Sequence, residues 1–337
     1  NSSAASDVYK RQVFNEPHYQ TIAFQTLDFM LHELATPTGG LAASLSAVDE
    51  QGVEGGYYLW RDAELAKVLS QDELAVVKKI WGIAGVPELE AGHHFRQVMT
   101  PKDAAKALNM SLSRLQSEFN SAQKKLRQVR SQRRLPKDDK TIAAWNGLAL
   151  SALAQAMTNP AGEKYRPAAT RLRDYLVKAL WDGQQLHRVM TKQGSIGRAG
   201  LEDYAYVSQG LLDWAEVSGH QQDRELAYAM IKQAWRLFYG KQGWQRTETM
   251  WLRYGVGETV LADGVMPAPS AVLIASSLRF NDESLAQQAV RALNVGDSEI
   301  SVEPFWNATQ IGVIRGYQET KTSTSLIGSE SSTSKVN

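Results

Sequence analysis

The sequence predicts a mainly α protein, an incomplete (α/α)6 toroid of helical hairpins with short strand segments after the outer helices. Two kinds of helical pattern alternate along the chain: one is apolar on nearly every face and the next is amphipathic. The pair recurs at a period of roughly 60–67 residues, which is typical of helical arrays. A short alternating segment follows the amphipathic helices, and this favours a ring over an open superhelix.

The two ends of the chain differ from its middle. Residues 1–12 show no helical or strand period and resemble translated adapter sequence, so we interpret them as a non-native leader. Residues 318–337 are small and polar, and we expect a disordered Ser/Thr-rich tail. The sequence therefore predicts one partial toroid domain over residues 13–317.

The first part of this domain is the least regular. A helix is expected at 17–35, and it is interpreted as the second half of a hairpin whose first helix is lost by N-terminal truncation. Further helices are expected at 61–69, 71–81 and 111–134, the last of them strongly basic.

Three hairpins follow, each with an apolar inner helix and an amphipathic outer helix. The inner helices are expected at 141–157, 201–217 and 269–279. The outer helices are expected at 162–181, 221–239 and 283–294, with strand-like segments at 182–190 and 241–252.

Composition excludes several classes of function. With 37 basic and 36 acidic residues the formal charge is +1, so no broad field attracts nucleic acid, and none is expected as a partner. The absence of cysteine excludes disulfides, thiol catalysis and Cys-ligated metals. No apolar run approaches the roughly 18 residues of a membrane span. We expect a soluble protein, and a cytoplasmic location is favoured.

No cofactor or metal is expected either. The sequence contains no phosphate-binding glycine loop and no serine elbow. His93 and His94 are adjacent, but no third ligand stands at a zinc-binding spacing, so we interpret them as solvated loop histidines.

Carboxylates stand at or just before the start of every inner helix. They are Asp138 and Asp139, then Glu202 and Asp203, then Asp263. Parallel inner helices bring their N-termini to one end of a toroid, so we expect these groups to share one mouth. The alternative is that they are ordinary helix N-caps.

Aromatic and amide groups follow the acids and favour a polyol ligand, because flat rings stack on C–H groups and carboxylates accept from hydroxyls. Glu54 lies in a glycine-flanked loop that either enters the mouth or forms a plain hairpin, and His187 alternates with apolar residues in a short strand. We predict Asp139, Glu202 and Asp203 as catalytic residues. The predicted substrate-binding residues are Glu54, Tyr57, Asp138, Trp145, Asn146, His187, Arg198, Tyr204 and Asp263.

Three segments resemble a known family, the spermatogenesis-associated protein 20 family. They are GVEGGYYLW at 52–60, RLPKDDKTIAAWNGLALSALA at 134–154 and LEDYAYVSQGLL at 201–212. The resemblance implies the C-terminal region of proteins that join a thioredoxin-like domain, absent here, to a toroid similar to N-acylglucosamine 2-epimerase and cellobiose 2-epimerase. The segment DGVMPAPSAV at 263–272 departs from the family pattern, which places a small polar Gly-Asn-Ser turn there.

Two functions remain open from the sequence. One is a carbohydrate-related enzyme of the six-hairpin toroid class, epimerase-like or glycosidase-like, acting on a sugar-like ligand. A glycosidase needs two carboxylates roughly 5–9.5 Å apart. The other is a non-catalytic ligand- or client-binding module that works with the missing thioredoxin-like domain. Carboxylates at catalytic spacing would favour the enzyme, whereas carboxylates satisfied as helix caps would favour the module.

Overall fold

The structure, a computed structural model, describes residues 17–248, 258, 261–295 and 297–319. The predicted leader at 1–12 and residues 320–337 of the predicted tail lie outside this part of the chain. Contacts divide the chain into two compact units, a small unit of residues 44–138 and a hairpin unit formed by the residues before and after it. The range 13–317, predicted as one domain, thus contains two units. None of the helices described here is long and apolar enough to cross a membrane.

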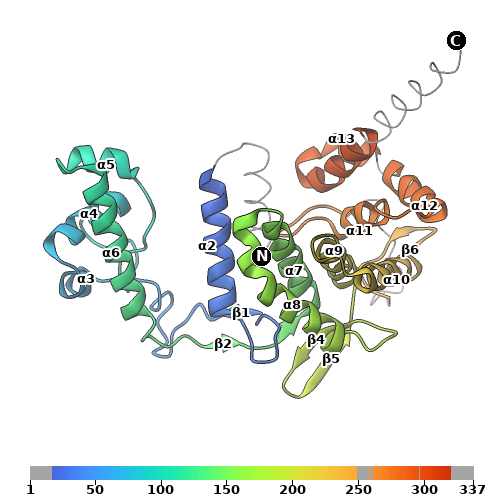
Figure 1. Cartoon of the computed structure of the whole chain (residues 1–337), viewed down its shortest axis with the longest axis horizontal. Helices are drawn as coiled ribbons and strands as arrows, with labels where there is room; N and C mark the ends of the chain where they lie inside the picture. The colour runs from blue at the N-terminus through green and yellow to red at the C-terminus, as the bar shows by residue number, and fades with distance from the viewer. Residues whose placement is uncertain (1–16, 249–257, 259–260, 296, 320–337) are drawn as a thin grey trace, which may run out of the picture. The chain divides into compact units, whose positions relative to one another are not determined.

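The hairpin unit contains the three predicted helix pairs (Figure 1). Its inner helix α9 (Leu201–Ser218) packs against both α7 (Ala143–Met157) and α11 (Pro269–Ser277). The outer helices are α8 (Arg166–Tyr175), α10 (Gln221–Phe238) and α12 (Glu283–Asn294), and each packs against its own inner helix. This arrangement confirms the predicted mainly α class and the order of helical hairpins.

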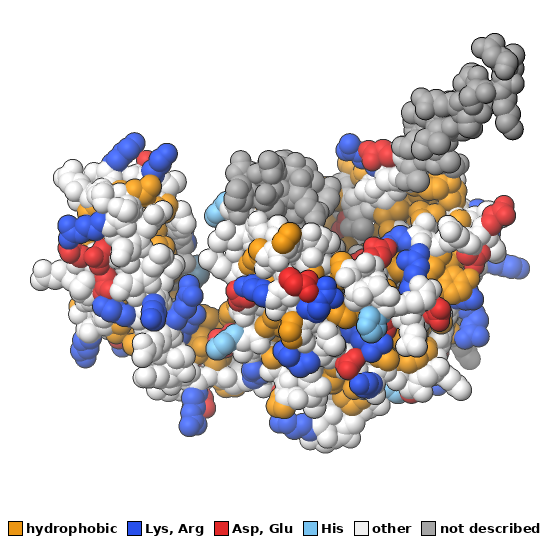
Figure 2. Space-filling view, in the orientation of Figure 1, with side chains coloured by type: hydrophobic (Ala, Val, Ile, Leu, Met, Phe, Trp, Pro, Cys, Tyr) orange, Lys and Arg blue, Asp and Glu red, His pale blue; other side chains and the backbone are white. Residues whose placement is uncertain are grey.

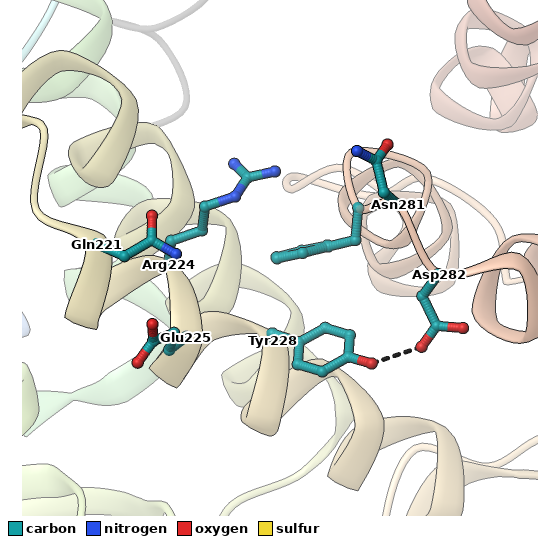
Figure 3. A pocket seen from close by; sticks show the side chains of 7 residues that line it. Gln221, Arg224, Glu225, Tyr228, Asn281 and Asp282 are labelled. Carbon is teal, nitrogen blue, oxygen red and sulfur yellow. Dashed lines mark hydrogen bonds between the residues drawn. The ribbon is translucent and has the colours of Figure 1, made fainter.

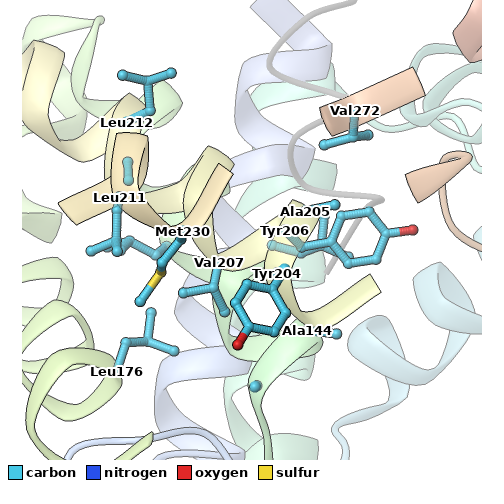
Figure 4. Close-up of a cluster of buried hydrophobic side chains, with 14 of the residues drawn as sticks. Ala144, Leu176, Tyr204, Ala205, Tyr206, Val207, Leu211, Leu212, Met230 and Val272 are labelled. Carbon is cyan, nitrogen blue, oxygen red and sulfur yellow. The ribbon is translucent and has the colours of Figure 1, made fainter. Parts of the chain in front are cut away.

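The inner and outer helices differ in burial as their sequence patterns predict. Helix α7 buries side chains on all sides, from Ala143 to Met157, whereas α8 buries only the face of Ala169, Leu172 and Tyr175. The apolar side chains of several helices meet in one core, which Figure 4 shows. Leu176, Val207, Met230 and Val272 are among its members.

Two glycines let α7 and α9 approach closely. A Cβ atom on Gly147 would lie 2.6 Å from the backbone of Tyr206, and one on Gly210 would lie 2.4 Å from the carbonyl oxygen of Gly147. Real side chains never reach such distances, so both positions require glycine. The Trp-Asn-Gly segment at 145–147 therefore includes a packing residue.

Short antiparallel strands flank the hairpins. β3 (Thr141–Ile142), β4 (His187–Thr191) and β5 (Gly194–Arg198) form a three-stranded sheet. The first two residues of the helix predicted at 141–157 are therefore strand, because they pair with Met190 and Val189. β6 (Tyr239–Gly240) and β7 (Gly243–Trp244) form a hairpin directly after α10, as predicted for an outer helix.

The remaining elements complete the hairpin unit. α2 (Pro17–Glu33) buries Leu27 and Met30 in the main core. A 3₁₀ turn and a π turn extend α8 at its two ends, and residues 308–319 are helical, two residues into the predicted tail. The other elements are η1 (Pro160–Tyr165), η2 (Leu176–Leu180), α13 (Asp297–Val302) and η3 (Pro304–Asn307).

The buried carboxylate of Asp223 connects three helices of the hairpin unit. Asp223 of α10 is 1% exposed; it accepts hydrogen bonds from the guanidinium of Arg173 on α8 and from Trp214 Nε1 on α9, the latter at 3.0 Å. Because both its oxygens are paired, the buried charge is compensated. One carboxylate thus fixes three helices relative to one another.

The small unit has its own cores, one of them centred on Trp60 and Leu65. Glu73 is buried and accepts hydrogen bonds from Lys125 Nζ at 2.8 Å, Ser121 Oγ at 2.7 Å and the Ser70 N–H at 2.7 Å. Burial acts to raise the pKa of Glu73, but these hydrogen bonds outweigh it and lower the pKa to about 2. The elements are β1 (Ser44–Leu45), α3 (Asp62–Val68), α4 (Gln71–Trp81), α5 (Pro101–Ala107), α6 (Leu112–Arg130) and β2 (Lys137–Asp138).

One expectation for this unit is wrong. His93 is not solvated: it is 7% exposed, and its Nε2 lies 2.8 Å from Asp62 Oδ2. The hydrogen bond from His93 is the main cause that lowers the pKa of Asp62. His94 is exposed, as expected. Within the described residues, no group of three or more His, Asp or Glu side chains is arranged to hold a metal ion.

Candidate ligand site at the inner-helix N-termini

The N-termini of the inner helices lie together at one end of the hairpin unit. Asp203, in the first turn of α9, accepts a hydrogen bond from the N–H of Ala144 at the start of α7, at 3.1 Å. Tyr206, one turn further along, donates its hydroxyl to the carbonyl oxygen of Pro267, just before α11. Two side chains of α9 therefore connect the starts of all three inner helices.

Asp203 has a structural role in this arrangement. Its second oxygen accepts the N–H of Gly200, the N-cap residue of α9, at 2.8 Å. The residue is 2% exposed. Burial raises its pKa to about 6, although the two N–H donors and the charge of Arg188 act in the opposite direction. The contacts of Asp203 are those of the helix-cap alternative.

Two further predicted ligand-binding side chains are paired with backbone groups. Asn146 accepts the N–H of Leu41 at 2.7 Å and donates to the carbonyl oxygens of Leu41 and Ile142. The Tyr204 hydroxyl accepts the N–H of Leu186 at 3.2 Å. Both side chains are buried, so they hold neighbouring segments in place below the surface of the site.

Asp263 is a helix cap as well. Its two oxygens accept the N–H of Ala268 at 2.7 Å and the N–H of Thr309 at 2.8 Å. It therefore joins the start of α11 to the start of the helix at 308–319. Capping was the alternative interpretation of this residue, and its contacts follow that alternative.

Accessible polar groups surround the buried caps. Glu202 Oε1 lies 3.8 Å from Arg246 Nη1, and Arg246 also contacts Glu258. Arg198 donates to Glu248 Oε2 at 3.0 Å. This charged edge therefore presents both donors and acceptors.

Two aromatic residues also stand near these helix starts. Trp145 lies one residue beyond Ala144 and is 37% exposed. Tyr206 is buried, and its pKa is raised by burial first and then by the charges of Glu202 and Asp263. The charges of both acids thus act on the same phenol.

The structure does not place Asp139 beside Asp203. Asp139 forms an ion pair with Lys192, at the turn between β4 and β5, and this hydrogen bond lowers its pKa. In the β4–β5 register, Thr191 and Gly194 pair near this turn, whereas His187 and Arg198 pair at the opposite end of the hairpin, next to α9. The predicted catalytic set Asp139, Glu202 and Asp203 is thus divided between the two ends of the hairpin.

His187 and Arg198 lie at the end nearer the inner helices. His187 Nε2 is 3.6 Å from Asp182 Oδ2, and its side chain is partly exposed. Arg198 is exposed and belongs to the charged edge already described.

The other three predicted residues belong to the small unit. Asp138 lies in β2, where it pairs with Ser44 of β1. Tyr57 is buried, and its carbonyl oxygen accepts from Arg133 at 3.0 Å. Glu54 is exposed. Its loop lies beside a polar cavity of about 670 Å³ whose lining includes Asp49, Arg61, Glu64 and Arg133.

Sequence reasoning missed three side chains of the charged edge. They are Arg246, Glu248 and Glu258, which follow the outer helix α10. Arg246 and Glu248 alternate in the segment after β7, a spacing that places both on one face of an extended chain. That spacing is the signal from which they could have been found.

Comparison with known proteins supports the resemblance. No family model matches the chain. The human spermatogenesis-associated protein 20 is 25% identical over 267 residues, which cover 69% of this chain and 34% of the human protein. The rat protein of the same name is 26% identical over 269 residues, with the same two shares. An uncharacterized protein of Caenorhabditis elegans is 24% identical over 255 residues, or 68% of this chain and 35% of its own length.

Among solved structures, a cellobiose 2-epimerase from Bacillus thermoamylovorans B4167 aligns with 80% of this chain and 70% of its own. Its sequence identity is 10% and its TM-score is 0.36. The chain spans about a third of the length of the curated relatives it matches. The resemblance read from the sequence is confirmed: the chain has homologues named spermatogenesis-associated protein 20, at about 25% identity over 69% of its length.

Proposed function

We propose that the hairpin unit is a non-catalytic binding module for a small polyhydroxylated ligand of the carbohydrate class. The ligand would bind at the N-terminal ends of α7, α9 and α11. The proposal rests on one observation: each of the three carboxylates predicted as catalytic is already paired with another group of the protein. Asp203 gives both its oxygens to backbone N–H groups, Asp139 pairs with Lys192, and Glu202 faces Arg246.

The charged edge suits a sugar better than an ion. Glu202 with Arg246, and Arg198 with Glu248, present acceptors and donors in nearly equal number. Hydroxyl groups can both donate and accept, so they complement such an edge. The partly exposed indole of Trp145 offers an apolar face for the C–H groups of a sugar ring.

The arrangement also argues against glycoside hydrolysis and epimerisation. Hydrolysis needs two carboxylates that face one space roughly 5–9.5 Å apart, and Asp203 is closed off from solvent. Epimerisation of the kind implied by the resemblance uses histidines, and α7, α9 and α11 contain none. A module of this kind would present its ligand to the thioredoxin-like domain implied for longer members of the family.

Calorimetric titration of the whole chain with neutral mono- and disaccharides tests this proposal. We expect saturable binding of at least one sugar, weakened about tenfold or more in Trp145→Ala, because that change removes the stacking surface. Phe29→Ala, at an exposed aromatic residue of α2, is the matched control and should bind as the unchanged chain does. No binding by any sugar, or equal weakening in both variants, would overturn the proposal.

A second function, a sugar-transforming enzyme, is favoured by one observation, the raised pKa of Asp203. A carboxyl group with a pKa of about 6 is suited to proton transfer near neutral pH. This function requires the α7–α9 junction to open, so that ligand reaches the side chain. Incubation with the sugars that bind, followed by NMR of the products, separates the two functions. Turnover that is lost in Asp203→Asn while binding remains would establish the enzyme and refute the non-catalytic module.

A further inference from the structure

We infer a second binding site on the hairpin unit, for one uncharged sugar-sized ligand, between the first turns of α10 and the loop that joins α11 to α12. Figure 3 shows this cavity. It is formed by elements other than those of the site at the inner-helix N-termini, and the inference does not depend on the function proposed for that site. Its volume is about 230 Å³. Such a space holds roughly a dozen non-hydrogen atoms, the size of one hexose.

One face of α10 forms the first wall. Gln221, Arg224, Glu225 and Tyr228 line the cavity, and their spacing of three, four and seven residues places them on the same side of the helix. The loop residues Phe280, Asn281 and Asp282 line it from the opposite side. The site therefore joins two segments more than fifty residues apart in the sequence.

Contacts at both ends hold the two walls in place. The Tyr228 hydroxyl donates to Asp282 Oδ2 at 2.5 Å, and Arg224 Nη2 donates to the carbonyl oxygen of Arg279 at 2.6 Å. Asp282 is fixed in turn, because it caps α12 through the N–H of Leu285 at 3.0 Å. The cavity is thus formed before any ligand binds, which reduces the entropic cost of binding.

Three polar side chains between these end contacts have unused hydrogen-bonding groups. The side chains of Gln221, Glu225 and Asn281 form no hydrogen bond with any other residue in the described part of the chain. Two of them are amides, which both donate and accept, and the third is a carboxylate, which accepts. This combination matches the hydroxyl groups of a sugar.

Aromatic rings supply the apolar part of the cavity. The rings of Tyr228 and Phe280 lie 5.0 Å apart between centroids and are inclined at 42°. C–H groups of a sugar ring pack well on such surfaces. An aromatic surface with amides and a carboxylate around it is the same chemistry that the sequence led us to expect at the inner-helix N-termini.

Charge compensation favours an uncharged ligand. The cavity contains the carboxylates of Glu225 and Asp282 and the guanidinium of Arg224, whose central carbon is 4.7 Å from the centre of the Phe280 ring. Lys232 Nζ lies 4.1 Å from the centre of the Tyr228 ring and supplies a second positive charge. Glu216 lies 3.8 Å from Arg224 and pairs with Arg279, so charges of both signs surround the cavity and neither dominates to select an anion or a cation.

Saturation-transfer NMR of the whole chain tests the inference, with glucose, galactose, mannose and N-acetylglucosamine as probes. We expect saturable transfer to at least one of them and affinity reduced about tenfold or more in the Gln221→Ala/Asn281→Ala variant, which loses two hydrogen-bonding amides. Both residues are exposed, so the fold should remain intact. In a chain that also carries Trp145→Ala, Phe280→Ala should abolish the transfer that remains, because the aromatic surface of this cavity is removed.

Gln222→Ala is the matched control, since this glutamine is exposed, adjacent in sequence and absent from the cavity lining. It should bind as the unchanged chain does. Trp145→Ala separates this site from the inner-helix site, and transfer that is lost in Trp145→Ala but unchanged in Gln221→Ala/Asn281→Ala would overturn the inference. The absence of transfer to all four sugars would also overturn it.

Discussion

At the scale of single residues, Asp203 shows how one carboxylate can fix the ends of two helices. Each of its oxygens accepts an N–H group that no intrahelical bond can satisfy, one at the start of α7 and one at the N-cap of α9. The same contacts require the side chain to be buried, and burial raises its pKa to about 6. Asp203 therefore stabilises the junction least when it is ionised.

This conflict predicts a pH dependence of stability with a definite sign. The folded pKa of about 6 lies above the ordinary value of 3.8, so between these values the folded chain binds more protons than the unfolded chain. The contribution of Asp203 to stability is thus complete below about pH 4 and is lost as the pH rises through 6. The difference is about 3 kcal/mol. Urea unfolding of the hairpin unit between pH 4 and 7 measures it.

Asp203→Asn is the variant that isolates this contribution. Asparagine does not titrate, so the difference in unfolding free energy between the two chains should change by about 3 kcal/mol between pH 4 and 7. Asp139→Asn is the matched control, because Asp139 is exposed. A constant difference between the unchanged chain and Asp203→Asn would refute the assignment.

The same residues show why the site could be predicted only in part. Sequence identifies which carboxylates stand near helix starts, and in the structure Asp203 and Asp263 accept backbone N–H groups at the starts of inner helices. It does not show which backbone N–H a carboxylate meets, and that contact decides between capping and exposure to a ligand. Asp139 was misplaced because residues 141–142 form a strand, whose pairing with β4 directs Asp139, two residues earlier, toward Lys192.

At the scale of elements, hydrophobic period predicted the long helices well because packing repeats over many turns. Helices α9, α10 and α12 begin within one residue of their predicted starts. Short elements carry few turns in which a period can be seen: α3, with seven residues, was predicted at 61–69, whereas α5, of the same length, was missed. The packing role of Gly147 and Gly210 could not be predicted from the sequence either, because it depends on the backbone of the partner helix.

Substitution of Gly147 tests the close approach of these two helices. Gly147→Ala places a methyl group against the backbone of Tyr206, which cannot move aside as a side chain would. We expect the unfolding free energy of the hairpin unit to fall by about 1–3 kcal/mol, as for other overpacked cores. Urea unfolding monitored by fluorescence measures the loss.

Gly312→Ala is the matched control for this substitution. Gly312 is also helical, but its Cβ would meet nothing within 4 Å. Alanine there should leave stability unchanged or raise it by up to about 1 kcal/mol, the usual gain for glycine to alanine in a helix. If both substitutions had the same effect, helix propensity and not the helix–helix contact would explain the result.

At the scale of the whole molecule, each of the two units has apolar cores and buried acids of its own. The hairpin unit has one large apolar core shared by inner and outer helices (Figure 4). The small unit has two smaller cores and a buried acid, Glu73, held by Lys125 and Ser121. Lys and Arg side chains are frequent over the surface of the small unit (Figure 2). Because each unit has its own core, we expect each to open independently.

Glu73 gives the small unit a pH dependence of opposite sign to that of Asp203. Its pKa of about 2 lies below the ordinary value of 4.5, so its contribution is complete above pH 4.5 and is lost as the pH falls toward 2. In Glu73→Gln the charged hydrogen bond to Lys125 is lost, while Lys125, whose side chain is 45% exposed, remains solvated. We expect the small unit to lose about 1–3 kcal/mol at pH 7.

Hydrogen exchange followed by mass spectrometry tests whether the units are independent. Glu73→Gln should accelerate exchange in α4 and α6 and leave α7 and α9 unchanged, because opening of the small unit does not require the hairpin core to open. Gly147→Ala should do the reverse, which makes each variant the control for the other. If either variant lowered protection equally in all four helices, the chain would unfold as one cooperative body and the division into two units would be wrong.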